Sequence, residues 1–401
     1  MRKNYLDELI SFKNDQIIKV ITGIRRSGKS TLLFDIYADY LLANGVDESQ
    51  IIKVDLEPME SKHLYNSDAL YKHITERLQN DRMNYVFIDE AQNCQGYEHV
   101  ADSLFIKKNV DVYITGSNAH MFSGKLATLL SGRYIEIEIL PLSFKEFAGA
   151  TKRPDESLPE VYRRFVKFGA FPKIVDYNGD TKKINTYLDG IYNTIFKKDI
   201  IERNSITNVP MFEAVMQFVL ANIGSPISAK SISDYLTSQN KKVYPQTVDD
   251  FLSAMVQSFI VYKVERFDVK GKEILKSLGK YYATDIGLRN YLLGFREMDG
   301  GHILENIVYF ELLRRGYKVF VGKVDSSEVD FVAQKQDDIL YIQVAETLNG
   351  EGGKKTTQER EFAPFKIIKD FRQRILITMD YDPNTDYNGI KHINALDFLM
   401  Q

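Results

Sequence analysis

The feature that most constrains the fold is a glycine-rich loop at residues 23–30, which reads GIRRSGKS and fits the pattern G-x-x-x-x-G-K-[ST]. The residues before it, 17–21, form an apolar run that predicts a buried strand, and residues 31–37 carry apolar side chains at helical spacing. A strand that turns through such a loop into a helix begins an α/β unit. The motif therefore predicts a parallel sheet with helices on its faces.

The loop has the composition of a phosphate-binding site. Its glycines let backbone N–H groups curl around a phosphate, and the following helix adds the partial positive charge of its N-terminus. We expect Lys29 to reach the β- and γ-phosphates of a nucleotide and the hydroxyl of Ser30 to ligate Mg²⁺. The residues predicted to hold the phosphates are Gly23, Arg25, Arg26, Ser27, Gly28, Lys29, Ser30 and Thr31.

A second strand of the same block ends in two acids. Residues 85–90 read YVFIDE, an apolar run followed by Asp89 and Glu90. We expect Asp89 to hold the Mg²⁺ shell and Glu90 to polarise an attacking water as a general base. The alternative is a strand that ends in two solvated acids. The glutamate beside the aspartate predicts hydrolysis rather than nucleotide binding alone.

Two further residues of this block are candidates for the same chemistry. The strand at residues 110–115 is followed by Gly-Ser-Asn, where Asn118 or Ser117 would contact the γ-phosphate or position water. A plain turn or helix cap is the alternative for this segment. Arg133, at the start of the alternating run 133–139, is a candidate arginine finger that acts in cis or on a neighbouring subunit, or else a surface arginine.

Composition limits the class of protein. The 401 residues predict two or three domains, and a 44% hydrophobic and 27% charged composition is that of a soluble globular protein. A net charge of −3 does not mark a nucleic-acid binder but permits a local basic patch. Cys94 is the single cysteine, so an intramolecular disulfide is excluded. With no apolar run long enough for a membrane span and no signal-peptide core, the sequence predicts a cytoplasmic protein.

The chain divides into three predicted domains, which make it an α/β protein overall. Residues 1–150 alternate strand and helix as a P-loop NTPase sheet of the AAA+-like type. Residues 151–290 are helical and end in a winged-helix pattern, and residues 291–401 form a C-terminal α/β domain like that of restriction endonucleases.

The winged-helix pattern raises the question of a DNA partner. Its last hairpin, the wing, would neutralise phosphates in a salt-dependent way. Its predicted recognition helix argues against sequence reading, because it begins with Asp249 and Asp250 and offers no arginine for guanine. DNA and protein therefore both stay open as partners. The wing cations are Arg266, Lys270, Lys272, Lys276 and Lys280.

The C-terminal domain shows the order of a metal-dependent nuclease with part of its chemistry missing. An acid on the helix at residues 304–316, Asp330 on a strand and an E/Q-x-K pattern on the next strand would hold Mg²⁺ and orient water. Here that pattern reads Gln343-Val344-Ala345, so alanine stands where the lysine is required. The sequence predicts a retained fold with degenerate chemistry.

Taken together, the chain resembles a large family of prokaryotic AAA+-type P-loop ATPases. These proteins join an N-terminal ATPase domain to a C-terminal region of uncharacterised function that looks like a winged helix and a degenerate restriction-endonuclease-like domain. The resemblance covers almost the whole chain and implies ATP binding and hydrolysis, with no biological role supplied. Beyond the loop and the acid-tipped strand it rests on TGS at 115–117, GR at 132–133, PLS at 141–143, GAFP at 169–172 and EVDF at 328–331.

The resulting hypothesis is a cytoplasmic, Mg²⁺-dependent ATPase whose nucleotide state changes the conformation of its C-terminal interaction region. The first alternative is a nucleotide-dependent DNA-binding switch or defence protein with little turnover, and the second is an active Mg²⁺-dependent nuclease. Arg133 acting in trans would require a homo-oligomer, whereas in cis a monomer suffices.

Overall fold

A computed structural model describes residues 2–119, 130–295, 299–348, 357–381 and 386–401. The chain forms two compact units, Met1–Pro141 with Gln257–Phe259, and Leu142–Val256 with Ile260–Gln401. The first unit ends close to the predicted boundary at residue 150. The predicted boundary at 290 instead falls inside the second unit. None of the described helices is both long and apolar enough to cross a membrane.

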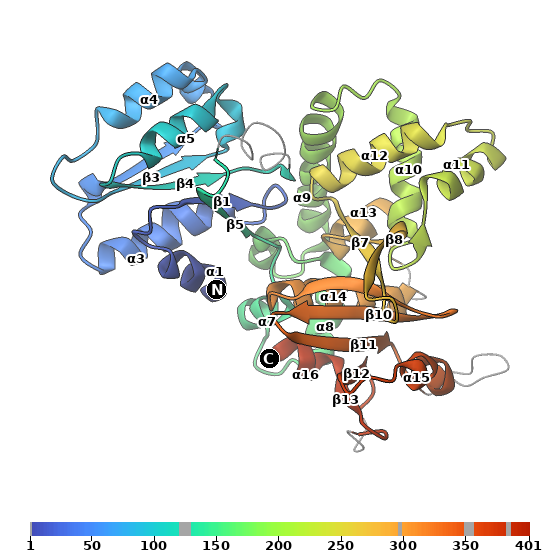
Figure 1. The fold of residues 1–401 in the computed structure, drawn as a ribbon. Helices are drawn as coiled ribbons and strands as arrows, with labels where there is room; N and C mark the ends of the chain where they lie inside the picture. Colours follow the sequence, from blue (N-terminus) through green and yellow to red (C-terminus); the bar gives the residue numbers. More distant parts are fainter. Residues whose placement is uncertain (1, 120–129, 296–298, 349–356, 382–385) are drawn as a thin grey trace. The chain divides into compact units, whose positions relative to one another are not determined.

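The first unit is built on a five-stranded parallel sheet in the order β2-β3-β4-β1-β5 (Figure 1). Its order places the strand that leads into the glycine loop, β1, next to β4, and β4 next to the acid-tipped β3. The strictly alternating run at 133–139 predicts a half-exposed or edge strand, and β5 is an edge strand with one neighbour. The strands are β1 (Ile18–Thr22), β2 (Ile51–Asp55), β3 (Asn84–Asp89), β4 (Val110–Thr115) and β5 (Tyr134–Glu138).

Helices cover both faces of this sheet, because side chains alternate along each strand (Figure 1). On β1, Val20 joins a core cluster with α4 and α5, whereas Ile21 joins the opposite cluster with α1 and α3. The helical segments are α1 (Lys3–Ser11), α2 (Lys29–Thr31), η1 (Leu32–Tyr37), α3 (Ala38–Ala43), η2 (Glu48–Gln50), η3 (Met59–Leu64), α4 (Ser67–Thr75), η4 (Ala91–Asn93) and α5 (Tyr97–Phe105).

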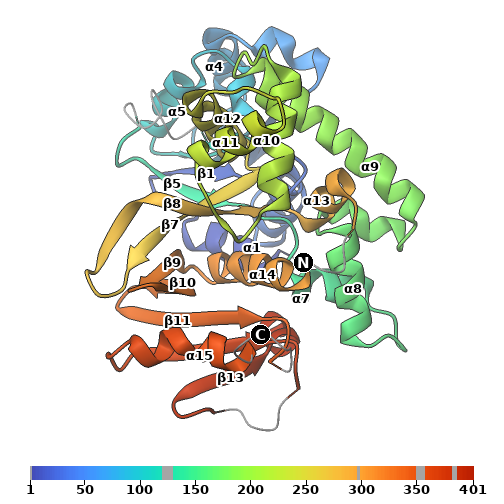
Figure 2. The same ribbon diagram turned by 90° about the vertical axis from the view of Figure 1, so that its right-hand side faces the viewer.

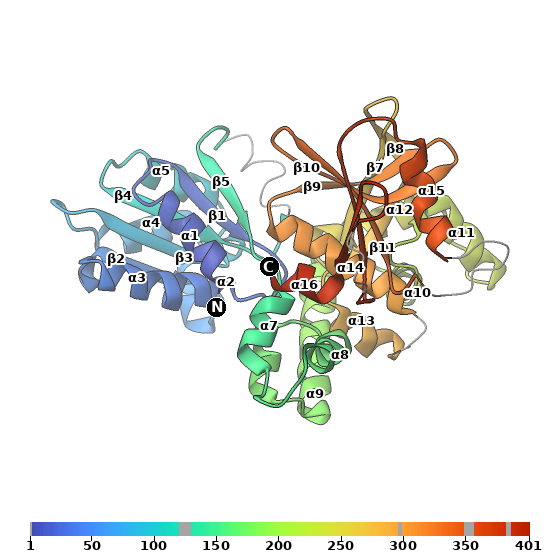
Figure 3. The ribbon, with the colours of Figure 1, turned by 90° about the horizontal axis from the view of Figure 1, so that it is seen from below.

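The second unit begins with helices that gather in one group (Figure 3). These are α7 (Phe144–Thr151), α8 (Leu158–Phe168), α9 (Thr181–Thr194) and α13 (Ile286–Leu293), with η6 (Pro172–Tyr177) and η7 (Ile195–Glu202) between them in the chain. Ser143 and Glu146 cap α7 reciprocally, as their spacing predicts.

The element order predicted for a winged helix is present in this unit. It runs α10 (Val209–Ala221), β6 (Pro226–Ile227), α11 (Ala229–Ser238), α12 (Pro245–Gln257), β7 (Val261–Asp268) and β8 (Glu273–Ala283). Strands β6 and β7 both pair antiparallel with β8. The element order therefore agrees with the sequence pattern, and the winged-helix assignment itself stays a proposal.

The hairpin β7–β8 does not stand free, because β7 also pairs with β9 in parallel. One eight-stranded sheet results, in the order β13-β12-β11-β10-β9-β7-β8-β6 (Figure 2). This pairing crosses residue 290 and is why the predicted second and third domains form one unit. The remaining elements are α14 (Gly300–Arg314), β9 (Lys318–Val324), β10 (Ser327–Lys335), β11 (Asp338–Ala345), α15 (Thr357–Ile367), β12 (Gln373–Thr378), β13 (Ile390–Asn394) and α16 (Ala395–Met400).

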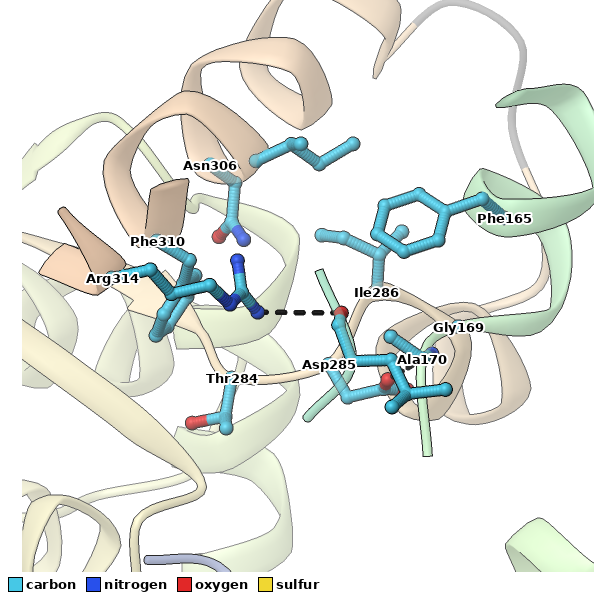
Figure 4. Close-up of a pocket in the computed structure, with 11 residues that line it drawn as sticks. Phe165, Gly169, Ala170, Thr284, Asp285, Ile286, Asn306, Phe310 and Arg314 are labelled. Carbon is cyan, nitrogen blue, oxygen red and sulfur yellow. Dashed lines mark hydrogen bonds between the residues drawn. The ribbon is translucent and has the colours of Figure 1, made fainter. Parts of the chain in front are cut away.

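The GAFP segment after α8 packs against the start of α13 (Figure 4). Gly169 has φ +81°, and a Cβ there would lie 2.3 Å from a carboxylate oxygen of Asp285. That carboxylate accepts hydrogen bonds from the backbone N–H of Ala170 (2.6 Å) and Leu288 (2.7 Å). The cavity beside it is about 30 Å³, with space for ordered water and none for a nucleotide. This segment therefore has a packing role.

Candidate nucleotide-binding site

The glycine loop follows β1 at the carboxyl edge of the first sheet. Gly23 (φ +133°), Arg26 (φ +68°) and Gly28 (φ +98°) have left-handed backbone conformations that curl the chain. A Cβ on Gly23 would lie 2.2 Å from the carbonyl oxygen of Ile139, so only glycine fits there. The loop then enters α2 at Lys29. This is the strand–loop–helix geometry that the motif predicts.

Lys29 is held inside this loop. Its side chain is buried, and Nζ donates hydrogen bonds to the carbonyl oxygens of Gly23 (2.9 Å) and Ile24 (3.2 Å). Both acceptors are neutral dipoles of the loop itself. The ammonium charge therefore lies where the predicted phosphates would be bound.

The predicted Mg²⁺ ligands Ser30 and Asp89 are in direct contact. Ser30 Oγ donates to Asp89 Oδ2 at 2.7 Å, and the hydroxyl of Thr115 donates to Asp89 Oδ1. Burial raises the pKa of Asp89 to about 6, although these two hydrogen bonds oppose the shift. Asp89 therefore loses its proton just below neutral pH.

A hydroxyl and a carboxylate suit Mg²⁺, which takes hard oxygen ligands and completes its shell with phosphate and water oxygens. Within the described part of the chain, no group of three or more His, Cys, Asp or Glu residues could hold a metal. An ion at Ser30 and Asp89 would therefore depend on the phosphates of the nucleotide.

Glu90 is buried beside Asp89 and held by several donors. Its Oε2 accepts hydrogen bonds from Gln92 Nε2 (2.5 Å) and Ser117 Oγ (3.1 Å), and lies 3.8 Å from Arg25 NH2. Burial alone raises the pKa of Glu90, but the charges of Lys29 and Arg25 and the hydrogen bonds from Gln92 and Ser117 outweigh it and lower the pKa below its ordinary value. The carboxylate is therefore ionised at neutral pH.

At the end of β4 the structure distinguishes the two predicted polar residues. Ser117 contacts Glu90, whereas Asn118 is buried directly after it. The role of Asn118 at a γ-phosphate stays a prediction. Thr115, which the sequence reasoning gave no role of its own, bridges the two acids: its hydroxyl donates to Asp89 and accepts from the backbone N–H of Glu90 at 3.0 Å.

Arg133 lies at the opposite edge of the sheet. Strand β5 runs parallel to β1, with Tyr134 paired to Ile18 at the amino end and Glu138 paired to Thr22 next to the loop. Arg133 therefore precedes the amino end of β5, where its guanidinium bonds Asp102. The register corrects the hypothesis of an arginine finger in cis, and the hypothesis of action in trans remains.

Arg2 is a second residue that the sequence reasoning missed. Its guanidinium is buried and donates hydrogen bonds to the carbonyl oxygens of Leu140 (2.8 Å) and Ser27. No local pattern marks it, because its partners lie far away in the sequence.

A separate charged cluster, here called the Lys280 cluster, occupies the second unit. Lys280 Nζ lies 2.9 Å from Glu305 Oε1, 2.8 Å from Glu328 Oε1 and 3.8 Å from Asp330 Oδ1. Burial alone lowers the pKa of Lys280, but the three carboxylates outweigh it and raise the pKa. The lysine therefore stays charged and neutralises the acids around it.

The nuclease-like residues do come together at this cluster. The backbone N–H of Asp330 donates to Gln343 Oε1 at 3.3 Å, and the N–H of Val344 donates to Asp330 Oδ2 at 2.8 Å. Ala345 is buried in the neighbouring position. The ammonium absent from β11 is thus supplied by Lys280 on β8, a residue that the sequence assigned to the wing.

Three of the five cations of the predicted wing are ion-paired, and phosphate binding by the wing stays a prediction. Lys280 belongs to the cluster, Arg266 NH2 lies 3.8 Å from Glu328 Oε2, and Lys270 Nζ lies 2.6 Å from Asp325 Oδ2. Lys272 is exposed, and the side chain of Lys276 lies outside the described residues. Among the described wing cations, Lys272 is therefore the one for which no ion pair is described.

The chain is similar to several known proteins. Residues 15–148 match the family described as an AAA domain, and residues 159–299 match a domain of unknown function, DUF8612. An uncharacterised protein of Haemophilus influenzae is 39% identical over 403 residues, covering 100% of this chain and 98% of the relative. An uncharacterised protein of Methanocaldococcus jannaschii is 32% identical over 377 residues, covering 88% of this chain and 79% of that protein.

Among solved structures, the Aeropyrum pernix Orc1 protein in complex with DNA shares 11% identity at a TM-score of 0.35, over 73% of this chain and 91% of its own. Cdc6p from Pyrobaculum aerophilum shares 11% identity at a TM-score of 0.30, over 77% and 94%. Likeness at this level supports no functional inference.

Proposed function

Because the chain belongs to the family of AAA-domain proteins that includes its Haemophilus influenzae relative, we propose that it binds ATP with Mg²⁺ and hydrolyses it. The nucleotide state then changes the conformation of the second unit, Leu142–Gln401 without Gln257–Phe259. The single cysteine and the absence of a membrane helix among the described residues are compatible with the cytoplasm as its location.

The contact between Ser30 and Asp89 carries this proposal. A phosphate-binding loop alone provides binding, whereas an acid that touches the first turn of the following helix provides a place for Mg²⁺. Glu90 adds a buried, ionised carboxylate one residue away. Strands β1, β3 and β4, which are neighbours in the sheet, deliver these groups to one edge.

Each group of residues at the site has its own role in the proposed reaction. The loop amides and Lys29 bind the phosphates, and Ser30 and Asp89 would hold Mg²⁺, which neutralises charge on the β- and γ-phosphates. Glu90 orients a water and accepts its proton as the water oxygen bonds to the γ-phosphorus. The bond from that phosphorus to the β–γ bridging oxygen breaks, and ADP and inorganic phosphate are the products.

The test is phosphate release from ATP with Mg²⁺, wild type beside Lys29→Ala. Loss of this charge-assisted contact is expected to reduce turnover at least about 100-fold. Lys72→Ala is the matched control, because Lys72 is 77% exposed and pairs with Glu76 on the outside of α4. Equal turnover in wild type and Lys29→Ala would refute the assigned role of the loop.

For the second unit we propose an interaction region, with protein as the first candidate partner. DNA is the second candidate, supported by the winged-helix element order and the exposed Lys272. Fluorescence anisotropy with duplex DNA at 50 and 200 mM salt separates them, since phosphate contacts weaken steeply with salt. Absence of binding at both salt concentrations would exclude DNA as a partner of the second unit.

A trans-acting Arg133 implies a homo-oligomer, which is a further part of the proposal. Lys29→Ala has a disabled loop and an intact arginine, whereas Arg133→Ala has the reverse. If Arg133 acts in trans, mixing the two inactive variants restores turnover at sites that combine both intact parts. A mixture no more active than its components would exclude this role.

A metal-dependent nuclease is not put forward. The Lys280 ammonium lies among the carboxylates of Glu305, Glu328 and Asp330 that a divalent ion would need. Lys280 is ion-paired with these acids, so a divalent ion would first have to displace its ammonium from them.

A further inference from the structure

The second residue of the chain is tied to the glycine loop. Arg2 is 4% exposed and donates through NH1 to the carbonyl oxygen of Leu140 at 2.8 Å and through NH2 to that of Ser27. Tyr5, on the first turn of α1, accepts a hydrogen bond from the N–H of Leu140 at 3.1 Å, and its ring lies 5.5 Å from the guanidinium. The guanidinium fork thus joins α1, the segment after β5 and the loop.

This arrangement has an energetic cost that its contacts must offset. Arg2 has φ +61°, a left-handed conformation that is unfavourable for a residue with a side chain. A buried guanidinium is also costly unless it is hydrogen-bonded. A buried and strained position of this kind persists only when the surrounding contacts determine it.

The contact with Ser27 has a geometric consequence for the loop. In a trans peptide the C=O of one residue and the N–H of the next point in opposite directions, and the described chain has no cis peptide bond. Arg2 holds the Ser27 oxygen on the side of the loop that faces α1. The N–H of Gly28 must then point the opposite way, into the loop where a phosphate oxygen would accept it.

Ser27 is fixed on its other side as well. Its own N–H donates to the carbonyl oxygen of Ile24 at 3.1 Å. Its side-chain Oγ is fully buried and has no hydrogen-bond partner among the described residues, so the loop as it stands leaves one polar group unsatisfied. A phosphate oxygen or a water at the loop would satisfy it.

We infer that Arg2 is a positioning residue that orients the Ser27–Gly28 peptide for polyphosphate binding. The inference rests on the proposed nucleotide site. Arg2 acts through the loop and itself touches no phosphate. Loss of the Arg2 side chain therefore weakens the binding of ligands that carry a β-phosphate. The part of the affinity that comes from the nucleoside is unchanged.

The test measures the ratio of ADP to AMP affinity by calorimetry with Mg²⁺. AMP lacks the β-phosphate that the loop is built to hold. In Arg2→Ala the ratio is expected to fall about tenfold, the effect of one hydrogen bond to a charged group. Arg2→Lys keeps the charge but replaces the planar guanidinium fork with a single ammonium on a shorter side chain, so an intermediate ratio is expected. Lys3→Ala, whose side chain is 83% exposed, is the control and should leave the ratio unchanged.

The outcomes separate two kinds of failure. Wild-type protein that binds no ADP overturns the proposed function and this inference with it. Wild-type protein that binds ADP, with an unchanged ratio in both Arg2 variants, overturns the inference alone. A general folding defect would lower the melting temperature and both affinities together without moving the ratio, which also counts against a positioning role. If Arg2→Ala fails to fold, the Arg2→Lys ratio decides.

Discussion

Two buried lysines are used in opposite ways in the two units. Lys29 is held by carbonyl oxygens of its own loop, and the nearby acids are bonded to hydroxyl and amide donors. Lys280 is held directly by carboxylates. The hydrogen bonds of Lys29 go to neutral carbonyl oxygens and its charge acts on Glu90 without direct contact, whereas Lys280 is in direct contact with the carboxylates of Glu305 and Glu328. The partners of a buried lysine, more than its burial, indicate whether it binds a ligand.

The largest predicted effect that tests this comparison of the two lysines concerns Glu90, the acid beside the glycine loop. Glu90→Gln keeps the shape of the side chain but removes the proton acceptor, so ATP turnover should fall about 10²–10⁴-fold. ADP affinity should change little, because Lys29 and the loop are intact. Phosphate release and calorimetry measure the two quantities, and parallel losses would show that Glu90 serves binding instead.

The second effect concerns the Lys280 cluster. Lys280→Met leaves the buried Glu305 and the partly exposed Glu328 and Asp330 without their cation, which should cost about 3 kcal/mol in the stability of the second unit. Urea unfolding followed by tyrosine fluorescence measures this cost. ADP affinity should stay within about twofold of wild type, because the predicted nucleotide ligands lie in the first unit. A variant as stable as wild type would show that the carboxylates are already protonated in the native protein.

A third effect follows from the pKa of Asp89, which burial raises to about 6. Metal binding needs the deprotonated carboxylate, so Mg²⁺ affinity should be complete above pH 7 and weaken as the pH falls through 6, about tenfold by pH 5. Titration of Mg²⁺ into the ADP complex at pH 5.0–7.5 measures this dependence. Asp89→Asn should bind Mg²⁺ weakly with a flat profile, and an unchanged slope in that variant would assign the titration to another group.

The smallest effect belongs to an exposed lysine of the same hairpin. Lys270 is 56% exposed and pairs with Asp325, which is 50% exposed. Lys270→Met should change stability by less than about 1 kcal/mol, since water screens such a pair. It is the matched control for Lys280→Met. Equal losses of stability in the two variants would show that the buried and the exposed ion pair stabilise the protein to the same extent.

Sequence predicted the parts of the site that are local in the chain. The glycine loop and the acid-tipped strand are each short, continuous motifs, and the alternation of strands and helices predicts the parallel sheet but not its strand order. Arg2 could not be found this way, because its contacts with Ser27 and Leu140 join distant segments. The position of Arg133 had a readable signal: a residue before a parallel strand lies at the amino edge, away from the loop.

In the second unit, the sequence pattern and the count of cations gave incomplete predictions, because neither contains the contacts between distant segments. Alternation identified the hairpin, but it does not show which strand borders it, so the β7–β9 pairing was missed. The cations of the hairpin were counted as surface charge because their partners, Glu305, Glu328 and Asp325, lie far along the sequence.

The β7–β9 pairing also limits how this chain can be divided. Arg266, Phe267 and Asp268 pair with Val321, Gly322 and Lys323, so separating residues 142–290 from 291–401 would expose two unpaired strand edges. Exposed edges of this kind are templates for aggregation. A truncation between the hairpin and the last strands is therefore expected to leave neither fragment soluble on its own, so residues 142–401 are best expressed together.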